Sequence, residues 1–277
     1  MDKADRRQRF FEEVRAEQPD LALLCLLVGA EADPDLGTAD MAACMDELDR
    51  IAEAVVRHRV PEGPYGWAEA LADVLGEGYG FHGVQSDYQR LDSSLLQHVL
   101  RRRRGLPILL SVVWVEVGRR LDAPVYGVAL PGHFVIGVGE PDRQHVLADP
   151  FRGGQALTVQ DTELLVSGTA GTTLTPSMLV PAEPLEIIAR ILNNIRAWAA
   201  VRPEHTSVQL WAVDLSLLLP HHPARLRFER AQLLVQQGDF LTGCVEMEEY
   251  AQVVAPLDPA AAETVRQRAR AARAMLN

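Results

Sequence analysis

The sequence is poor in cysteine, in lysine and in long apolar runs, and the shortages of cysteine and of apolar runs each exclude a class of protein. The three cysteines, Cys25, Cys44 and Cys244, are too few and too scattered for a disulfide framework, and no CxxC pair predicts structural zinc. Each lies in an apolar helical pattern, where a buried thiol behaves as a small hydrophobic side chain. No apolar run approaches the roughly 20 residues that cross a bilayer, and the longest, 21–30, is followed by acidic residues.

The N-terminal segment 1–13 carries both signs of charge and lacks a secretory apolar region and a cleavage site. We therefore expect a soluble, cytoplasmic protein with no membrane partner. Lys3 is the only lysine, a bias toward arginine that is typical of a GC-rich genome. The net charge is −11, whereas general nucleic-acid binders are usually basic, so no nucleic-acid partner is expected. The one basic cluster, Arg101–Arg104, ends a predicted helix, and we interpret it as a solvated helix end, with a contact to an anion or an acidic partner as the alternative.

Residues 1–104 have the spacing of amphipathic helices, in which apolar side chains such as Met41 and Leu48 recur at helical intervals. Glycine and proline interrupt this pattern at several joints, among them Pro61. The glycine-rich stretch Gly76–Gly83 predicts an ordered loop instead of a regular helix.

The centre of the chain has a different pattern. Pro107 follows a Gly-Leu break and is well placed for the first turn of a helix. The run 108–121 is apolar almost all round, which predicts a deeply buried helix. Three valine-rich runs bounded by turn residues then predict strands over 124–130, 133–138 and 144–148. A buried helix followed by antiparallel strands is typical of an α+β fold.

The segment 151–183 is rich in Gly, Thr and Pro, and we interpret it as an ordered connector that can add a hairpin, because its Leu164, Leu165 and Val166 need burial. From Pro184 the pattern is helical again. Two apolar helices joined by a Gly-Asp-Phe turn stand between Pro220 and Pro256, close to the period of a tetratricopeptide repeat. An ordinary helical hairpin is the alternative.

These patterns predict two domains. Residues 1–183 form a helical layer and a core of about residues 85–160, and residues 184–277 form a helical repeat region.

Two polar residues stand out in the predicted sheet. His133 begins the second strand and Asp149 follows the third, so antiparallel pairing can bring them side by side. A carboxylate that accepts a hydrogen bond from one imidazole nitrogen orients the ring and raises the basicity of the other nitrogen. From spacing alone, a structural pair and the orienting half of a catalytic triad both fit. His82, in the glycine-rich loop, is a weaker candidate for the same cleft.

The sequence resembles the transglutaminase-like superfamily, which is related to papain, and more closely the SirB family of bacterial proteins. In that family such a domain precedes a tetratricopeptide-like tail. The resemblance covers nearly the whole chain and depends on short motifs: Asp92-Ser93, Arg104-Gly105-Leu106-Pro107, Ser111, Pro131-Gly132-His133-Phe134 and Asp149-Pro150-Phe151 with Gly153-Gly154.

Enzymes of this superfamily place a cysteine at the start of the central helix, a histidine on the following sheet and an aspartate on the next strand. The resemblance carries the last two roles onto His133 and Asp149, and the cysteine position onto Pro107 or a neighbour. No cysteine lies between Cys44 and Cys244. The resemblance therefore implies a His–Asp pair without the thiolate that attacks an amide.

Other groups could replace the thiol. Ser111 lies one turn beyond Pro107, but a mid-helix serine lacks the dipole of a helix N-terminus. Cys25 or Cys44 could fold back into the cleft. A metal could bind His133 and Asp149 with a further ligand, although no HxxE or HxH spacing supports one.

The sequence thus favours a non-catalytic transglutaminase-like protein that binds a peptide or protein partner and needs no cofactor. The first alternative is a hydrolase or acyl transferase that uses His133 and Asp149 with an unconventional nucleophile. The second is a structural scaffold or regulator that acts through its repeats. The sequence leaves the oligomeric state open.

Overall fold

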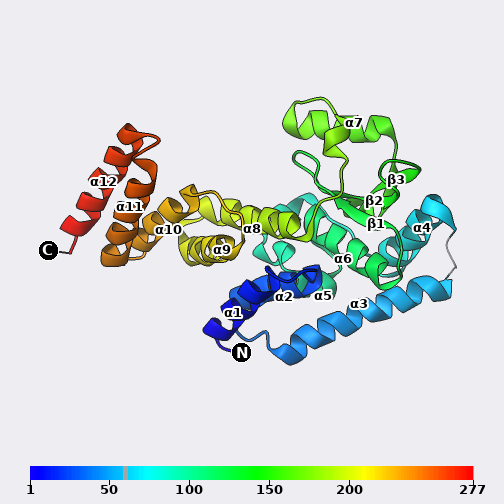
Figure 1. The fold of residues 1–277 in the computed structure, drawn as a ribbon. Helices are drawn as coiled ribbons and strands as arrows, with labels where there is room; N and C mark the ends of the chain where they lie inside the picture. Colours follow the sequence, from blue (N-terminus) through cyan, green and yellow to red (C-terminus); the bar gives the residue numbers. More distant parts are fainter. Residues whose placement is uncertain (59–61, 277) are drawn as a thin grey trace. The chain divides into compact units, whose positions relative to one another are not determined.

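The computed structural model describes residues 1–58 and 62–276, so the expected break at Pro61 lies outside the described residues. The chain divides into two compact units (Figure 1). The first contains Met1–Arg9 and Ala16–Ile191, and the second contains Phe10–Arg15 and the chain from Leu192 onward. Within the described residues, no helix is long and apolar enough to span a membrane.

Helices make up the N-terminal part of the first unit. The Asp20 carboxylate caps the second of them by accepting from the Leu23 amide at 2.9 Å, which satisfies one of the amides that a helix start leaves without a partner. The expected loop at Gly76–Gly83 is in part a π-helix, η1. In order, the elements are α1 (Lys3–Glu13), α2 (Leu21–Ala32), α3 (Thr38–His58), α4 (Gly63–Leu71), η1 (Ala72–Gly78), η2 (Gln85–Gln89), η3 (Leu91–Ser94) and α5 (Leu96–Arg102).

The central helix α6 (Pro107–Arg120) is deeply buried, as its apolar sequence predicts. Even its one acidic residue, Glu116, is only 1% exposed. Arg119 and Arg120 donate to the Glu116 carboxylate at 2.9 and 2.7 Å, so this buried charge is compensated.

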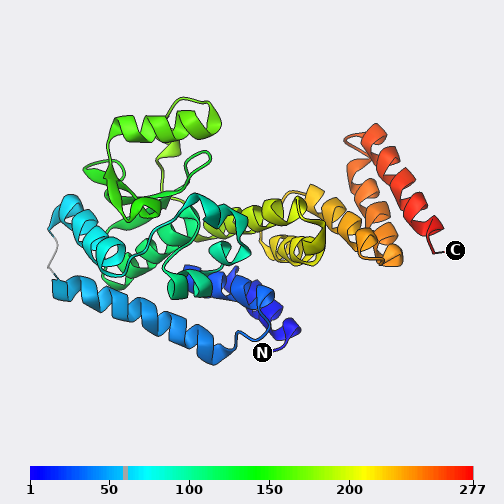
Figure 2. The same ribbon diagram turned by 180° about the vertical axis from the view of Figure 1, so that it is seen from behind.

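The sheet has four antiparallel strands in sequence order: β1 (Val125–Val128), β2 (Val135–Gly139), β3 (His145–Asp149) and β4 (Gln155–Leu157). Helix α6 packs on one side of it, and α7 (Val159–Ala170) lies on the other (Figure 1, Figure 2). The α7 side is closed by an apolar cluster that includes Val128, Val135, Leu147 and Val166. The three expected strands are present as β1, β2 and β3. Strand β4 and helix α7 follow them in the segment where an ordered connector was expected.

The connector 151–183 is more regular than its composition indicates. It contains the end of η4 (Pro150–Arg152), the strand β4, the helix α7 and η5 (Pro176–Met178). Strand β4 forms a tight hairpin with β3, and the apolar run that follows is helical. The expected burial is right for Val166 and wrong for Leu164, which is 70% exposed, because a helix turns these neighbours to different sides.

The C-terminal elements are α8 (Pro184–Ala200), η6 (Pro203–His205), α9 (Thr206–Leu218), α10 (Arg225–Gln236), α11 (Phe240–Val254) and α12 (Pro259–Ala274). The predicted turn joins α10 to α11, where Gly238 has a φ of 88° and Asp239 caps α11 through the Thr242 amide. Gly243 allows close packing, since a Cβ there would overlap the Val235 side chain. Small and flexible side chains, including Ala231, Cys244, Met247 and Ala269, fill the core of these last helices.

Candidate functional site

A tight turn places His133 at the entry to β2. In the sequence Leu130-Pro131-Gly132-His133, the His133 amide donates to the Leu130 carbonyl at 3.3 Å. Gly132 has a φ of 74°, which a type II turn requires at its third position, and proline favours the second. The Pro-Gly pair therefore fixes the backbone position from which the His133 side chain extends.

Two side chains from outside the sheet hold this turn. The Arg190 guanidinium on α8 donates from Nη2 to the carbonyls of Leu130 and His133, each at 2.7 Å. Thr169 on α7 donates to the Pro131 carbonyl at 2.8 Å. Among the described residues no carboxylate pairs with Arg190, and burial lowers its pKa. The charged guanidinium of Arg190 thus stabilises the turn that carries His133 through these two hydrogen bonds.

The aspartate lies at the end of β3, where the chain turns sharply. Asp149 caps η4 by accepting from the Phe151 amide at 3.0 Å. Gly153 and Gly154, with φ of 70° and 87°, close the turn, and the Gly154 amide donates to the Asp149 carbonyl at 2.9 Å. The Asp-Pro-Phe-x-Gly-Gly motif is therefore a turn that presents one carboxylate.

The two side chains meet as predicted. His133 Nε2 lies 3.1 Å from Asp149 Oδ1, and the residues are only 8% and 1% exposed. An ionised carboxylate only accepts hydrogen bonds, so the shared proton lies on Nε2, and Nδ1 is the nitrogen that a neutral ring leaves as the acceptor. Within the described residues no hydrogen bond reaches Nδ1. Asp149 Oδ2 is also buried without a hydrogen bond, and Arg152 is the nearest cation, with its Nε at 3.8 Å.

Helix α6 starts at Pro107, also as predicted, after Leu106 as its N-cap. Ser111, one turn on, lies on the same side of the helix and donates to the Phe134 carbonyl at 3.5 Å. That side of the helix therefore faces the entry to β2. Ser111 is fully buried, and in the part of the chain that the structure describes no hydrogen bond joins it to His133.

The native cysteines lie elsewhere, as free thiols on α2, α3 and α11. Burial, together with the negative charge of Glu116, raises the pKa of the Cys25 thiol well above its usual value. Burial also raises the pKa of Cys44. Among the described residues, no group of three or more His, Cys, Asp and Glu side chains is arranged to hold a metal ion.

Two aromatic residues lie near the pair: Phe151, which belongs to a motif quoted above, and Tyr88, which sequence reasoning missed. The Phe151 ring lies 6.1 Å from the His133 ring and 6.0 Å from the ring of Tyr88, measured between centroids. Burial, with the negative charge of Asp149, raises the pKa of Tyr88. No motif marks Tyr88, because its position in η2 brings it to the site only through the tertiary fold.

The glycine-rich stretch Gly76–Gly83 packs against the turn that follows Asp149. A Cβ at Gly76 would overlap the Gly153 carbonyl, and one at Gly83 would overlap the Phe151 ring. The Gly83 amide donates to the Phe151 carbonyl at 2.9 Å. His82 is exposed, and its ring contacts the Gly80 carbonyl.

The basic cluster ends α5, as the sequence predicts, but only Arg101 is exposed and the other three arginines are paired with acids. Arg102 and Arg104 both pair with Asp87, at 3.2 and 3.3 Å, and Asp87 is fully buried. Arg103 pairs with Glu47 and accepts the His82 amide on its carbonyl at 3.1 Å. The solvated assignment is wrong for these three arginines because their acidic partners are distant in sequence.

Comparison with known proteins agrees with this fold. The family model of the transglutaminase-like superfamily matches residues 42–193, and a tetratricopeptide repeat model matches residues 195–277. The chain therefore belongs to the transglutaminase-like superfamily, with repeats after its transglutaminase-like domain.

Its relatives include UPF0162 proteins of bacteria. One from Xylella fastidiosa is 29% identical over 236 residues, or 82% of each chain, and one from Pseudomonas aeruginosa is 33% identical over 193 residues, or 69% of each. The mouse F-box only protein 21 is 27% identical over 177 residues, which are 61% of this chain and 27% of that protein.

Proposed function

We propose that the chain is a non-catalytic, SirB-type member of its superfamily that binds a peptide or protein partner. The observation that carries this is Pro107 at the first position of α6, where the superfamily resemblance expects the nucleophilic cysteine. Proline offers neither a thiol nor a hydroxyl. His133 and Asp149 are then the remnant of a triad, kept in a cleft that binds instead of cutting.

The geometry of the pair supports this proposal. With its proton on Nε2 toward Asp149, His133 can act as a base only through Nδ1. A base contributes to acyl transfer by deprotonating a nucleophile within hydrogen-bond reach. Across the described residues no thiol or hydroxyl donates to Nδ1, so the pair has nothing of its own to activate.

The alternative is a hydrolase with an unconventional nucleophile, for which Ser111 is the candidate. Its burial and its hydrogen bond to the Phe134 carbonyl speak against it, since a nucleophile must reach the substrate. A fluorophosphonate probe separates the two: the hydrolase acquires the label at a serine and loses it in His133→Ala, whereas the binding protein stays unlabelled.

A scaffold or regulator that acts through the repeats is the remaining candidate. The match of residues 195–277 to a tetratricopeptide model favours it, because such repeats present extended binding surfaces. Partner binding that survives His133→Ala and is lost on substitution in the repeats would assign binding to that region.

The decisive experiment restores the missing group. We expect no thiol-dependent amidase or transamidase activity from the wild-type protein. The Pro107→Cys variant should react with iodoacetamide faster than the wild type at neutral pH, because the N-terminus of α6 and His133 both stabilise a thiolate. The native thiols are a low background, since burial raises the pKa of Cys25 and Cys44.

The control is the double variant Pro107→Cys with His133→Ala, which keeps the helix terminus and removes the imidazole. Its thiol should have a higher pKa and react more slowly. If Pro107→Cys reacts no faster than the wild type, His133 and Asp149 are not the remainder of a triad that has lost only its nucleophile. Amidase activity in the wild-type protein would overturn the proposal outright.

A further inference from the structure

A groove with a volume of about 560 Å³ lies within the first unit, on the face of α7 that turns away from the sheet. After Gly171, which ends the helix with a φ of 63°, the chain turns back beside α7 (Figure 1). The helix and this returning chain form the walls, which are lined by Gln160, Glu163, Leu164 and Ser167 and by residues 172–174. The four helix residues recur at intervals of three and four, so they form one stripe.

The apolar part of the groove comes from two leucines. Leu164 is 70% exposed although it lies in the middle of a helix. Leu174, on the other wall, is half-buried against the apolar cluster between α7 and the sheet. Covering Leu164 would remove apolar surface from water, which favours binding of a ligand that carries an apolar portion.

The returning chain leaves its main-chain groups without partners. Among the described residues, no backbone hydrogen bond engages an N–H or C=O group of Thr172, Thr173 or Leu174. The sequence Thr-Thr-Leu-Thr is typical of strands, and Thr175, at its end, has the extended backbone angles φ −125° and ψ 152°. An unpaired, extended stretch of chain is a template for the addition of a further strand.

The charge of the groove is negative and uncompensated. From residue 153 to residue 182 the only charged side chains are Asp161 and Glu163. The Asp161 carboxylate is engaged, because it accepts from the amide and the hydroxyl of Thr158 at 2.9 and 2.6 Å. No ion pair or hydrogen bond engages the Glu163 carboxylate within the part of the chain that the structure describes. A cation therefore fits this groove, and a nucleic acid or an anionic membrane would be repelled.

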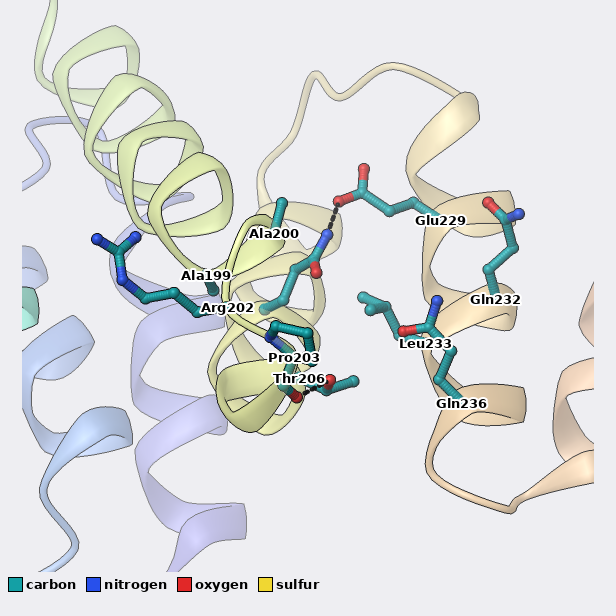
Figure 3. A pocket seen from close by; sticks show the side chains of 10 residues that line it. Ala199, Ala200, Arg202, Pro203, Thr206, Glu229, Gln232, Leu233 and Gln236 are labelled. Atoms are coloured by element: carbon teal, nitrogen blue, oxygen red, sulfur yellow. Dashed lines mark hydrogen bonds between the residues drawn. The ribbon is translucent and has the colours of Figure 1, made fainter.

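A pocket of equal volume in the second unit, between α8, α9 and α10, has no such charge to offer (Figure 3). Its carboxylate, Glu229, accepts from Gln209 Nε2 at 3.1 Å and from Arg196 Nε at 3.2 Å. Figure 3 shows the Arg202 guanidinium directed away from that pocket. Charge, and not volume, therefore distinguishes the groove on α7.

A lysine or arginine side chain matches both features of the helix wall. Such a side chain has an apolar stem below its charged end. Glu163 and Leu164 are neighbours in the groove, so one basic side chain can place its stem on Leu164 and its charge against Glu163.

We propose that this groove binds an extended, basic segment of a partner polypeptide, which adds as a strand to residues 172–174 and sets a lysine or arginine against Glu163 and Leu164. The inference rests on the proposed function, because it names the class of partner, and it involves neither His133 nor Asp149. The net charge of −11 attracts a basic partner over longer distances as well.

The first test reverses the charge. Random twelve-residue peptides displayed on phage are selected against the full-length wild type and, separately, against the full-length Glu163→Arg variant. We expect the wild type to select a lysine or arginine at a fixed position, and the variant to select an aspartate or glutamate there. The best wild-type peptide, synthesised with a fluorophore, should bind Glu163→Arg about tenfold more weakly, since an attraction becomes a repulsion.

The second test examines strand addition without changing the protein. A set of the same peptide is synthesised with one N-methyl group at each position in turn, which removes one N–H donor at a time. Successive residues of a strand point to opposite sides, so every second methylation should weaken binding by about tenfold and the others by about twofold or less. A helical ligand, or one held by its side chains alone, shows no period of two.

Matched variants show whether this groove is the site. Leu164→Ala should weaken binding at least about fivefold, whereas Leu257→Ala, at a leucine 88% exposed in the second unit, should change it by less than about twofold. Ala200→Trp fills the pocket of Figure 3 from an exposed position and should also leave the affinity unchanged. Circular dichroism of each variant checks that it remains folded.

The proposal is wrong if no peptide is enriched, if both proteins select the same charge, if methylation shows no alternation, or if Leu164→Ala binds as tightly as the wild type. It is also wrong if Ala200→Trp abolishes binding, because the peptides then bind in the second unit. In that case the chain still binds peptides and the proposed function stands. Amidase activity in the wild-type protein would instead overturn the proposed function and leave the charge-reversal result intact.

Discussion

At the scale of single residues, the site depends on groups that do no chemistry. Arg190 carries a full charge, yet among the described residues it has no acidic partner and binds two carbonyls of the Leu130–His133 turn. Its guanidinium carbon also lies 5.5 Å from the centre of the Phe134 ring. Two hydrogen bonds from one nitrogen fix both ends of the turn, so Arg190 positions His133 without touching its imidazole.

We therefore expect Arg190→Met to lower the free energy of unfolding by about 1.5–3 kcal/mol, the usual range for hydrogen bonds to a charged group. Arg190→Lys should recover part of this loss, because an ammonium keeps the charge and donates hydrogen bonds without the planar fork. Denaturant midpoints measure the stability. The nitrogen chemical shifts of His133 report its tautomer, which should become mixed only in the methionine variant. Unchanged shifts there would mean that Arg190 stabilises the fold without orienting His133.

Tyr88 reports on the charge of Asp149. Burial, and then the negative charge of Asp149, favour the neutral phenol and raise its pKa above the usual value of about 10. The associated stability is present below that value and is lost as the pH rises through the raised pKa. Asp149→Asn should lower the Tyr88 pKa part of the way, since burial remains. Ultraviolet titration measures the Tyr88 pKa, with the Tyr88→Phe variant identifying which part of the signal belongs to Tyr88. An equal Tyr88 pKa in the wild type and in Asp149→Asn would contradict the prediction.

At the scale of elements, a contact without side chains joins η1 to the turn after β3. Gly76 lies so close to the Gly153 carbonyl that a Cβ there would overlap it. Backbone cannot move aside as a flexible side chain can, so the glycine-rich stretch is required by this approach and not by loop flexibility.

Gly76→Ala should therefore destabilise the protein by about 1–3 kcal/mol, the usual cost of forcing atoms into a packed region. Gly168→Ala is the matched control, because a Cβ at this position in α7 meets nothing within 4 Å. It should be neutral or stabilise by up to about 1 kcal/mol, since alanine is the better helix former. Thermal unfolding compares the two, and equal effects would show that η1 and the turn separate readily.

Several elements could be predicted from the sequence because their signals are local. Pro107 begins α6 because proline suits a first turn, and the valine-rich runs are strands. The His133–Asp149 contact follows from two motifs that flank adjacent strands. The roles of Tyr88 and Arg190 could not be predicted, because each side chain reaches the site from an element distant in sequence.

Other errors have the same origin. The buried Asp87 neutralises Arg102 and Arg104, and no local pattern links an acid to bases 15 and 17 residues away. Helix α7 was not predicted, because its segment is rich in Gly and Thr. Thr158 and Asp161 nevertheless form a capping box at its start. That pair is a signal that sequence reasoning could have used.

At the scale of the whole molecule, the division into two units has a consequence for stability. The apolar cluster around Met247 draws all its buried members from residues 231–272, within α10, α11 and α12. In repeat structures each helix pair stabilises mainly its neighbours, and regions can open separately. Loss of packing in this cluster should therefore stay local to the second unit.

Met247 is 3% exposed, and Met247→Ala should lower local stability by about 2–5 kcal/mol through lost burial and a cavity. Met275→Ala, at a position 67% exposed, makes the same change with an expected effect within about 0.5 kcal/mol. Hydrogen exchange read by mass spectrometry should show reduced protection in peptides from residues 225–272 of the Met247 variant. Peptides from residues 107–149, which contain α6, His133 and Asp149, should keep theirs. Equal loss in both regions would show that the chain unfolds as one cooperative body, so that a ligand in the repeats would stabilise the region of the His–Asp pair as well.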